Sequence, residues 1–354
     1  MIRNELYLED VNLVANLDLP WEKFRNSSFL ITGASGLLGS FLVDVLMKRN
    51  ATGMNCKVYA MGRNAEKAKS KFEAYWGNPL FQFVEHDINQ PLNRANMGDV
   101  GYVLHLASNT HPLAYSTDPI GTITTNILGL MYLLDFAVDH HAVRFAFASS
   151  NEIYGENRGD VELFDENYCG YINSNTMRAG YPESKRCGEA MCQAYKKQKG
   201  LDVVIPRFTR SYGPTMLSTD TKAISQFIKK GVAGEDIVLK SAGTQYYSYT
   251  YMADAISGLL YILLLGQNGE AYNIADESSD IMLKDLAGLI AAYRGKKVVF
   301  ELPDEVEKAG YSTATKARLD GSKLHGLGWE PAYNIETGIQ RTLEILDEIG
   351  GNQA

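Results

Sequence analysis

Short apolar runs alternate with longer amphipathic stretches through the first two hundred residues. The apolar runs have the length and the β-branched or aromatic content of strands, and they are Ser28–Ile31, Lys57–Met61, Gln82–Val84, Tyr102–Leu106, Phe145–Ala148 and Asp202–Pro206. Stretches with helical spacing separate them near residues 37–49, 64–75, 120–139 and 181–199. Because alternating strands and helices form right-handed crossovers, this order predicts an α/β fold with a doubly wound parallel sheet covered on both faces.

The pattern becomes less regular after Arg207, where helices are predicted near 222–232, 282–293 and 335–348. We therefore expect three parts. They are an N-terminal extension over residues 1–27, a sheet domain over 28–206 with a returning segment near 251–275, and a smaller C-terminal α/β substrate domain over 207–354. The extension has a polar helical pattern, and we expect Trp21 and Phe24 to pack it onto the sheet domain.

Three glycines follow the first predicted strand at intervals of three residues. Gly33 permits a tight turn, Gly36 lets a pyrophosphate approach the backbone, and Gly39 lets the next helix pack closely on the strand. The N-terminus of that helix favours phosphate charge. This strand, turn, helix and second strand indicate a Rossmann-type NAD(P) site, whose phosphate-binding residues are expected to be Gly33, Ser35, Gly36, Leu37, Leu38 and Gly39.

The end of the second predicted strand bears on the choice between NAD and NADP. An acidic residue there commonly holds the adenosine ribose, but this sequence has Arg63 beside that position. A guanidinium suits a 2′-phosphate, so Arg63 favours NADP, although an arginine stacked on adenine or exposed in a turn fits either cofactor. Asp87 and Ile88 are placed to meet the adenine, and Leu106, Ala107 and Ser108 to pass under the nicotinamide ribose.

A tyrosine and a lysine four residues apart begin the helix predicted near 181–199. Tyr181 and Lys185 share one helix face, and Pro182 is tolerated in the first turn. An ammonium beside a phenol favours the phenolate, so we expect Tyr181 to exchange a proton near neutral pH. An exposed helix face that happens to carry both residues is the plain alternative.

The segment before that helix supplies further candidates. Residues 149–155 directly follow an apolar strand, where active-site groups of open α/β sheets gather. The Ser150 hydroxyl could share the proton of a substrate hydroxyl with Tyr181. Glu152 is a candidate base or electrostatic partner, and equally an ordinary loop carboxylate or helix cap.

Composition and charge narrow the classes of function. The 354-residue chain has a formal net charge of −8, so it lacks the basic excess that nucleic-acid binding needs, and no such partner is expected. Four cysteines without a CxxC pair predict reduced, cytoplasmic thiols and no metal site. The polar N-terminus is unlike a signal peptide, and the most apolar run, Ile256–Leu265, is too short to span a bilayer, so no membrane partner is expected.

The glycine turn, the Ser/Tyr/Lys set and residues 207–214 resemble the extended short-chain dehydrogenase/reductases that modify nucleotide sugars. The resemblance covers residues 28–345 and is closest to the UDP-glucuronate decarboxylases, through His105–Ser108, Tyr115, Asp118–Pro119, Thr122–Asn126, Glu166–Tyr168, Arg178, Tyr181–Arg186 and Gly328–Pro331. It implies tightly bound NAD or NADP, a UDP-sugar, and transient oxidation at C4 after Tyr181 takes the 4-OH proton. It also implies catalytic roles for Ser150, Glu152, Tyr181 and Lys185, cofactor contacts from Asn126, Tyr181 and Lys185, and substrate contacts from Ser108, Asn151, Arg178, Arg210 and Tyr249.

Decarboxylation is the first of three outcomes that the residues leave open. It fits the catalytic set, but Tyr247 stands where the family usually has an arginine, and a phenol cannot replace a guanidinium toward an anion. Arg210 or Arg178 would have to supply that charge. Tyr247 belongs to a group of tyrosines that either line the nucleotide pocket or form an aromatic strand, namely Tyr246, Tyr247, Tyr249 and Tyr251.

The alternatives are a 4-epimerase and then a 4,6-dehydratase. Epimerisation needs only oxidation, rotation of the ketone and reduction from the other face. Dehydration is disfavoured because Asn151 stands in place of the acid that protonates the leaving hydroxyl. A non-enzymatic NAD(P)-sensing Rossmann protein is a further alternative, which the retained tyrosine and lysine oppose.

Two predicted helices carry more apolar residues than one stripe requires. They include Leu128, Leu130, Met131, Leu133 and Leu134 near 120–139, and Met191, Cys192, Ala194 and Tyr195 near 181–199. Burial against the sheet accounts for most of these. The resemblance implies that such helices pair in a four-helix interface, so we expect a homodimer.

Overall fold

The computed structural model describes residues 1–92, 97–110, 115, 117–301 and 315–351. Its α-helices are α1 (Glu5–Ala15), α2 (Leu37–Ala51), α3 (Ala65–Lys71), α5 (Pro119–Thr124), α6 (Leu130–Asp139), α7 (Gly180–Lys199), α8 (Ala223–Ala233), α9 (Met252–Leu265), α10 (Leu283–Ala292), α12 (Ser322–His325) and α13 (Ile335–Gly351). Short 3-10 turns are η1 (Trp21–Phe24), η2 (Glu73–Tyr75), η5 (Asn151–Tyr154), η6 (Met177–Ala179) and η7 (Glu277–Ser279), and η4 (Thr125–Gly129) is a π-helical turn.

The strands are β1 (Ser28–Thr32), β2 (Lys57–Gly62), β3 (Phe81–Glu85), β4 (Tyr102–His105), β5 (Arg144–Phe147), β6 (Ser149–Ser150), β7 (Val203–Phe208), β8 (Arg210–Tyr212), β9 (Ile237–Leu239), β10 (Tyr246–Tyr251), β11 (Ala271–Ile274), β12 (Asp280–Met282), β13 (Val298–Phe300) and β14 (Lys316–Ala317). The strands and helices predicted before Arg207 are therefore confirmed, with ends that differ by a few residues. The predicted helices near 222–232, 282–293 and 335–348 are α8, α10 and α13.

A parallel sheet forms the centre of the molecule and confirms the predicted fold class. Its strand order is β3-β2-β1-β4-β5-β7-β11, and β6 pairs with β7. Every residue of β1 is buried, as expected for a strand covered on both faces. The strand order reverses between β1 and β4, and open α/β sheets bind their ligands at such a switch point.

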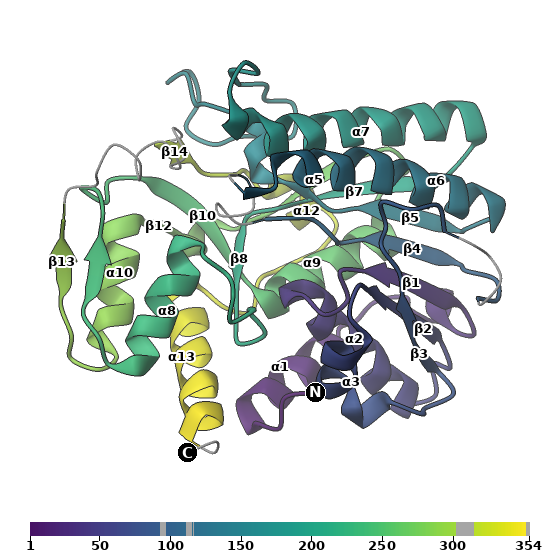
Figure 1. Cartoon of the computed structure of the whole chain (residues 1–354), viewed down its shortest axis with the longest axis horizontal. Helices are drawn as coiled ribbons and strands as arrows, with labels where there is room; N and C mark the ends of the chain where they lie inside the picture. Colours follow the sequence, from purple (N-terminus) through teal and green to yellow (C-terminus); the bar gives the residue numbers. More distant parts are fainter. Residues whose placement is uncertain (93–96, 111–114, 116, 302–314, 352–354) are drawn as a thin grey trace.

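Helices cover both faces of this sheet (Figure 1). α2 and α9 lie against one face, with α1 packed outside α2, whereas α6 and α7 lie against the other. By length and composition alone the helical stretch Pro119–Asp139 could cross a membrane. However, 44% of its apolar window is buried inside the fold, and the core helix of a globular protein passes the same test.

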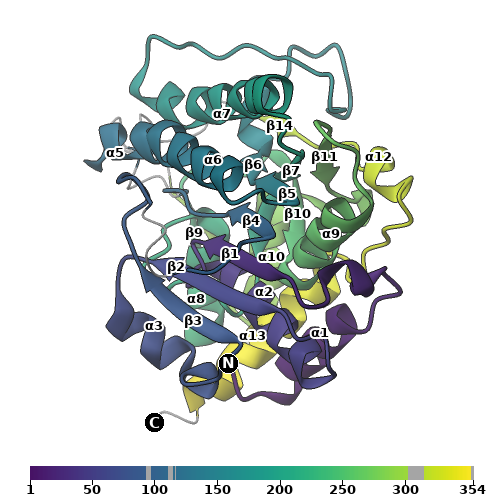
Figure 2. The same cartoon turned by 90° about the vertical axis from the view of Figure 1, so that its right-hand side faces the viewer.

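Apart from β11, which joins the large sheet, the strands after β7 form smaller sheets beside it (Figures 1 and 2). β10 pairs antiparallel with β12 and parallel with β8 and β14, while β9 and β13 form a parallel pair. One residue, Thr209, separates β7 of the large sheet from β8 of the smaller one, and its hydroxyl hydrogen-bonds that of Thr250 in β10 at 2.5 Å. The small sheet therefore begins at the carboxyl edge of the large one.

The N-terminal extension packs across elements of both parts. Trp21 and Phe24 are buried, as predicted from their position in an otherwise polar segment. The Tyr7 hydroxyl donates to Asp44 Oδ2 of α2 at 2.6 Å. On the other side of α1, Asp10 Oδ2 accepts a hydrogen bond from the Tyr251 hydroxyl at the end of β10, also at 2.6 Å.

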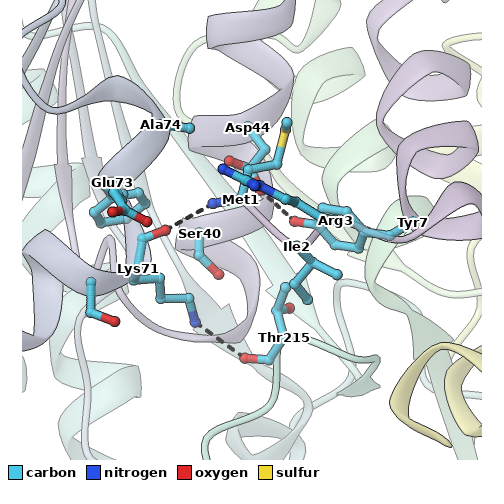
Figure 3. A pocket seen from close by; sticks show the side chains of 12 residues that line it. Met1, Ile2, Arg3, Tyr7, Ser40, Asp44, Lys71, Glu73, Ala74 and Thr215 are labelled. Atoms are coloured by element: carbon cyan, nitrogen blue, oxygen red, sulfur yellow. Dashed lines mark hydrogen bonds between the residues drawn. The ribbon is translucent and has the colours of Figure 1, made fainter. Parts of the chain in front are cut away.

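A cavity of about 200 Å³ lies beside α2 and α3, where the first residues of the chain cross them (Figure 3). Burial raises the pKa of the Asp44 carboxyl in its wall, and burial lowers the pKa of Lys71 to about 8. Lys71 Nζ donates to the carbonyl oxygen of Ser35 at 3.0 Å, within the glycine turn. The cavity is lined by none of the predicted site residues, and Lys71 connects its wall to the turn.

Candidate active site

The glycine turn has the geometry that a diphosphate requires. Gly33 has φ +66°, and a Cβ there would lie 2.8 Å from Ala107 Cα. A Cβ on Gly39 would overlap the Gly33 carbonyl oxygen and lie 2.8 Å from Ala34 Cα, so α2 could not pack on β1. Gly36 is the N-cap of α2 and gives no side-chain hydrogen bond to the first turn. The amides that follow, at Leu37 and Leu38, therefore suit a phosphate.

The predicted adenine-side residues lie at the ends of β2 and β3. Arg63 and Asp87 are exposed, whereas Ile88 is buried. Asp87 Oδ1 accepts a hydrogen bond from the Asn89 amide at 3.0 Å, which closes a turn after β3. Ile88 packs closely against Gly129, directly before α6, and a Cβ on Gly129 would lie only 3.0 Å from the Ile88 side chain. The start of α6 therefore fits closely against the segment that follows β3. This arrangement leaves Arg63 accessible to a cofactor that lies across β1 and β2.

A chain of hydrogen bonds connects the end of β4 to the catalytic helix. The Ser108 hydroxyl donates to Asn126 Oδ1 at 2.8 Å, and Asn126 Nδ2 donates to Ser184 Oγ at 2.9 Å. Ser184 in turn donates to the carbonyl oxygen of Tyr181 at 2.8 Å. Asn126 is fully buried in the π-helical turn η4, a rare form often found at functional sites. Ser184 was not among the predicted site residues, although it lies directly before Lys185.

Tyr181 and Lys185 lie together at the start of α7, but their ionisation differs from the prediction. Burial raises the pKa of Tyr181, the Glu152 carboxylate adds to the rise, and Ser150 and Arg178 oppose it. Burial lowers the pKa of Lys185 to about 7, against the attraction of Glu189. Lys185 Nζ donates to the Ala148 carbonyl oxygen at 2.8 Å. The expectation that the Lys185 ammonium brings Tyr181 to titrate near neutral pH gains no support, because burial of Tyr181 itself raises its pKa and the lysine is also desolvated.

Ser150, Asn151 and Glu152 form the turn that follows β6. Ser150 Oγ accepts the Glu152 amide at 3.2 Å as an N-cap, and it lies 3.5 Å from Asn151 Oδ1. Ser150 and Asn151 are both buried. The Glu152 carboxylate pairs with Arg178 Nη2 at 2.7 Å, so Arg178, predicted to contact substrate, is held by a carboxylate of the protein.

Tyr115 links the ion pair to Tyr181. The Arg178 guanidinium lies over the Tyr115 ring at 4.8 Å from its centroid. The Tyr115 ring stacks on that of Tyr181, with centroids 5.1 Å apart. The sequence analysis used Tyr115 only as part of a family motif, because no spacing rule connects it to a helix that begins 65 residues later.

The tyrosines predicted either to line the nucleotide pocket or to form an aromatic strand lie on β10 and have different surroundings. Tyr251 is 1% exposed and bonded to Asp10, so it belongs to the core that joins α1 to β10. Tyr249 is 2% exposed and lies beside Arg210 in the β8–β10 pair. Tyr247 is also buried, and the Arg210 guanidinium lies on its ring, 3.5 Å from the centroid.

A second buried ion pair supports the catalytic turn from behind. Arg207 Nη2 and Nε donate to the two carboxylate oxygens of Glu189 at 2.7 and 3.0 Å. Glu189 Oε1 also accepts the Ser149 hydroxyl at 2.5 Å. Glu189 lies one helical turn after Lys185, a spacing that could have signalled a shared face. The pair fixes Ser149, and through it the neighbouring Ser150, against β7.

The residues that the structure describes contain no group of three His, Cys, Asp or Glu side chains able to hold a metal ion. The glycine turn of Gly33, Gly36 and Gly39 presents backbone amides that are suited to bind a phosphate. Tyr181 and Lys185 are buried, and Lys185 Nζ reaches the Ala148 carbonyl oxygen just beyond the end of β5. The donor set therefore fits a dinucleotide.

Comparison with known proteins gives matches over most of the chain. Residues 29–275 match the NAD dependent epimerase/dehydratase family. The chain is 30% identical over 326 residues to UDP-glucuronic acid decarboxylase 6 of Arabidopsis thaliana, covering 89% of each chain. It is 31% identical over 321 residues to UDP-glucuronic acid decarboxylase 1 of Xenopus tropicalis, covering 90% of this chain and 71% of that protein.

Solved structures show the same fold. A dTDP-glucose 4,6-dehydratase from Streptomyces venezuelae with NAD bound superposes with a TM-score of 0.78 at 24% identity, covering 92% of this chain and 98% of that one. A UDP-glucuronic acid 4-epimerase from Bacillus cereus, solved with UDP-glucuronic acid and NAD, gives 0.76 at 23% identity, covering 91% and 99%. At these identities, both comparisons show a shared fold.

Proposed function

The chain belongs to the NAD dependent epimerase/dehydratase family, and from this premise we propose that it decarboxylates UDP-glucuronate after transient oxidation of the sugar at C4. It is an NAD-dependent extended short-chain dehydrogenase/reductase that acts on a nucleotide sugar. The observation that carries the reaction is that Tyr181, at the start of α7, lies close to Ser150 and Glu152 of the turn after β5, beside a buried Lys185.

The reaction follows from the chemistry of these groups. Tyr181 takes the proton of the sugar 4-OH, and the Ser150 hydroxyl shares that proton. When bound at the glycine turn, NAD would supply the acceptor for the C4 hydride and its later return, and its nicotinamide charge would oppose the rise that burial causes in the pKa of Tyr181. The 4-ketone makes the C6 carboxylate a β-keto acid, which loses carbon dioxide and leaves an enolate. C5 then takes up a proton, and C4 is reduced again as Tyr181 returns the proton to the C4 oxygen. The chain's part is to hold the sugar and to provide the proton donors.

A 4-epimerase is the second candidate, and one contact favours it. Glu152 already serves as the ion-pair partner of Arg178, so it has a structural role without acting as a base. Epimerisation would require no role of Glu152 beyond this ion pair. The buried amide Asn151 in place of a carboxylic acid continues to disfavour dehydration.

Product masses separate these reactions. Purified enzyme is incubated with UDP-glucuronate, UDP-galacturonate, UDP-glucose and dTDP-glucose. Decarboxylation predicts loss of carbon dioxide from UDP-glucuronate. An unchanged mass with inversion at C4, seen by NMR, would replace the decarboxylase by the epimerase, and loss of water would indicate dehydration.

Two variants with matched controls test the residues. Tyr181→Phe should lower turnover by roughly 10²–10⁴-fold, the range for loss of a general acid–base group, whereas Tyr195→Phe on the same helix should not. Glu152→Gln should slow decarboxylation, with exposed Glu156→Gln as its control. A near-normal rate for Glu152→Gln would favour epimerisation, and normal turnover by Tyr181→Phe would refute both mechanisms.

We also propose that Arg63 lets the site accept NADP as well as NAD. The proposal is supported by its exposed position after β2 and by the fit of a guanidinium to a 2′-phosphate. Arg63→Ala should weaken NADP binding more than NAD binding. Equal effects on the two cofactors, measured by titration, would contradict the proposal, and retention through gel filtration would test for tight binding.

A cytoplasmic homodimer completes the proposal. The four cysteines are free, which suits a reducing compartment. Ile120, Ile123 and Leu128 are exposed by 38–75% along α5 and η4, and such an apolar face suits a partner helix. Leu128→Glu should shift a dimer toward monomer in light scattering, whereas Leu217→Glu, exposed elsewhere, should not. A wild-type mass equal to one chain would refute the dimer.

A further inference from the structure

Lys71, the last residue of α3, binds both the glycine turn and the segment that follows β8. Its Nζ donates to the Ser35 carbonyl oxygen at 3.0 Å and to the Thr215 carbonyl oxygen at 3.5 Å (Figure 3). The Thr215 hydroxyl donates in turn to the carbonyl oxygen of Leu37, in the first turn of α2, at 2.8 Å. One ammonium group therefore joins the turn to a segment 144 residues further along the chain.

The contact with Ser35 fixes one end of the peptide group between Ser35 and Gly36. A trans peptide group is planar, so its carbonyl oxygen and its N–H point in opposite directions. The Gly36 N–H at the other end donates to the Gly33 carbonyl oxygen at 2.9 Å. Because both ends of this peptide group are bonded, the amides of Leu37 and Leu38 that follow keep the direction that suits a phosphate.

The Lys71 side chain lies in the wall of the cavity beside α2 and α3, where it is poorly hydrated. Burial lowers its pKa to about 8, and the Asp44 carboxylate of α2 opposes that shift. The other charged or titratable groups that line this cavity are the Met1 ammonium, which donates to the Lys71 carbonyl oxygen at 2.9 Å, and the side chains of Arg3, Tyr7 and Glu73. Lys71 is therefore charged at neutral pH and loses its charge at mildly alkaline pH.

An ammonium in such a place carries a cost that a diphosphate would reduce. Two carbonyl oxygens replace only part of the hydration that the charge loses on burial. A diphosphate bound at the turn adds negative charge close to the Ser35 carbonyl, and the attraction is strong where water is excluded. The protonated lysine and the diphosphate therefore stabilise each other.

We propose that Lys71 is a positioning residue for the cofactor: its ammonium, held by the Ser35 and Thr215 carbonyl oxygens, fixes the glycine turn in the form that binds the NAD diphosphate. Lys71 acts through the backbone of the turn and not on the reacting atoms. The inference rests on the cofactor site, so it holds whether the sugar is decarboxylated, epimerised or dehydrated.

The test is calorimetric titration of NAD into the full chain at pH 6.5, 7.5 and 9. Lys71→Met should raise the NAD dissociation constant on the order of 10-fold at pH 6.5, the effect of losing a hydrogen bond from a charged donor. At pH 9 the wild-type affinity should approach that of the variant, because most of the wild-type lysine is then neutral. Equal affinity of the two proteins at pH 6.5 overturns the proposal.

The pH profile distinguishes this role from a merely structural one. Lys185, whose pKa is about 7, contributes equally to the profiles of wild type and variant, so their difference reports Lys71. Lys71→Arg keeps its charge throughout the range, so it should bind NAD at pH 9 more tightly than the wild type. Parallel profiles for wild type and Lys71→Met, or a loss in Lys71→Arg as large as in Lys71→Met, would refute the role of the charge.

Exposed Lys69 on the same helix provides the matched control. Lys69→Met should leave both the affinity and its pH profile unchanged, and an equal loss there would overturn the proposal by assigning the effect to the surface charge of α3. If Lys71→Met folds poorly, as a lowered urea midpoint would show, the wild-type and Lys71→Arg profiles still decide the outcome.

The same titrations separate this inference from the proposed reaction. If the wild type binds NAD and releases no carbon dioxide from UDP-glucuronate, decarboxylation fails while the effect of Lys71→Met on NAD affinity remains measurable. If Lys71→Met binds NAD as the wild type does and releases carbon dioxide, decarboxylation stands and the role of Lys71 falls.

Discussion

Lys185 is almost fully buried, and its charge makes stability depend on pH. Its pKa falls from 10.5 to about 7 on folding, so the unfolded chain binds more protons between these values. Stability from this group therefore rises with pH from about 7 toward 10.5, and the ammonium is unfavourable below that window. Lys185→Met should accordingly stabilise the protein more at pH 6 than at pH 9, by roughly 1.4 kcal/mol for each pKa unit removed.

Thermal unfolding of both proteins at pH 6, 7.5 and 9 checks this prediction. Loss of the hydrogen bond to the Ala148 carbonyl oxygen changes the free energy of unfolding of the variant by the same amount at every pH. The quantity to compare is therefore how the stability difference between variant and wild type changes with pH. Parallel pH profiles would show that Lys185 keeps its ordinary pKa when folded. Exposed Lys197→Met on the same helix should give such parallel profiles.

At the scale of residues, the sequence predicted the chemical groups better than their partners. The spacing of Tyr181 and Lys185 places both on one helix face, and that relation is local. The pairing of Glu152 with Arg178 crosses 26 residues and depends on how η6 folds back over the turn after β6. Burial was also invisible in the sequence, and it reverses the expected ionisation of Tyr181.

At the scale of elements, the contact between β1 and α2 depends on the third glycine of the turn. A Cβ at Gly39 would overlap the Gly33 carbonyl oxygen, whereas a Cβ at Gly288 in α10 meets nothing within 4 Å. Gly39→Ala should destabilise the fold by about 1–3 kcal/mol, the usual cost of overpacking, and abolish NAD retention. Gly288→Ala should raise stability by up to about 1 kcal/mol through helix propensity.

Urea unfolding and NAD titration measure both variants. The two substitutions are chemically identical and both lie within helices, so a difference between them isolates the close approach of α2 to β1. Normal NAD affinity in Gly39→Ala would show that the helix can shift without disturbing the turn.

The elements of the large sheet were predictable because strand and helix periods alternate with little ambiguity. The periodicity did not predict the strand order, which is known only from the structure. The smaller sheets depend on pairs distant in sequence, such as β8 with β10. The π-helical turn at Asn126 adds one residue to a helical turn, and the apolar pattern near 120–139 gave no sign of it.

At the scale of the whole molecule, α1 connects parts of the fold that are distant in sequence. Asp10 is fully buried and accepts hydrogen bonds from Tyr251 of β10, from Tyr333 and from Arg341 of α13, at 2.6 to 2.9 Å. The same helix meets α2 through Tyr7. The sequence indicated a packed N-terminal segment from Trp21 and Phe24, but its polar helical pattern gave no sign that Asp10 is buried.

Asp10→Ala should therefore destabilise the protein by about 3–5 kcal/mol, because it leaves the Arg341 cation without its buried partner. Glu9 provides the control, since it also pairs with Arg341, at 3.1 Å, but its side chain is 56% exposed. Glu9→Ala should cost less than about 1 kcal/mol. Urea unfolding midpoints measure both changes. Equal losses would mean that Arg341 is satisfied from the solvent side, and that the buried carboxylate does not hold α1, β10 and α13 together.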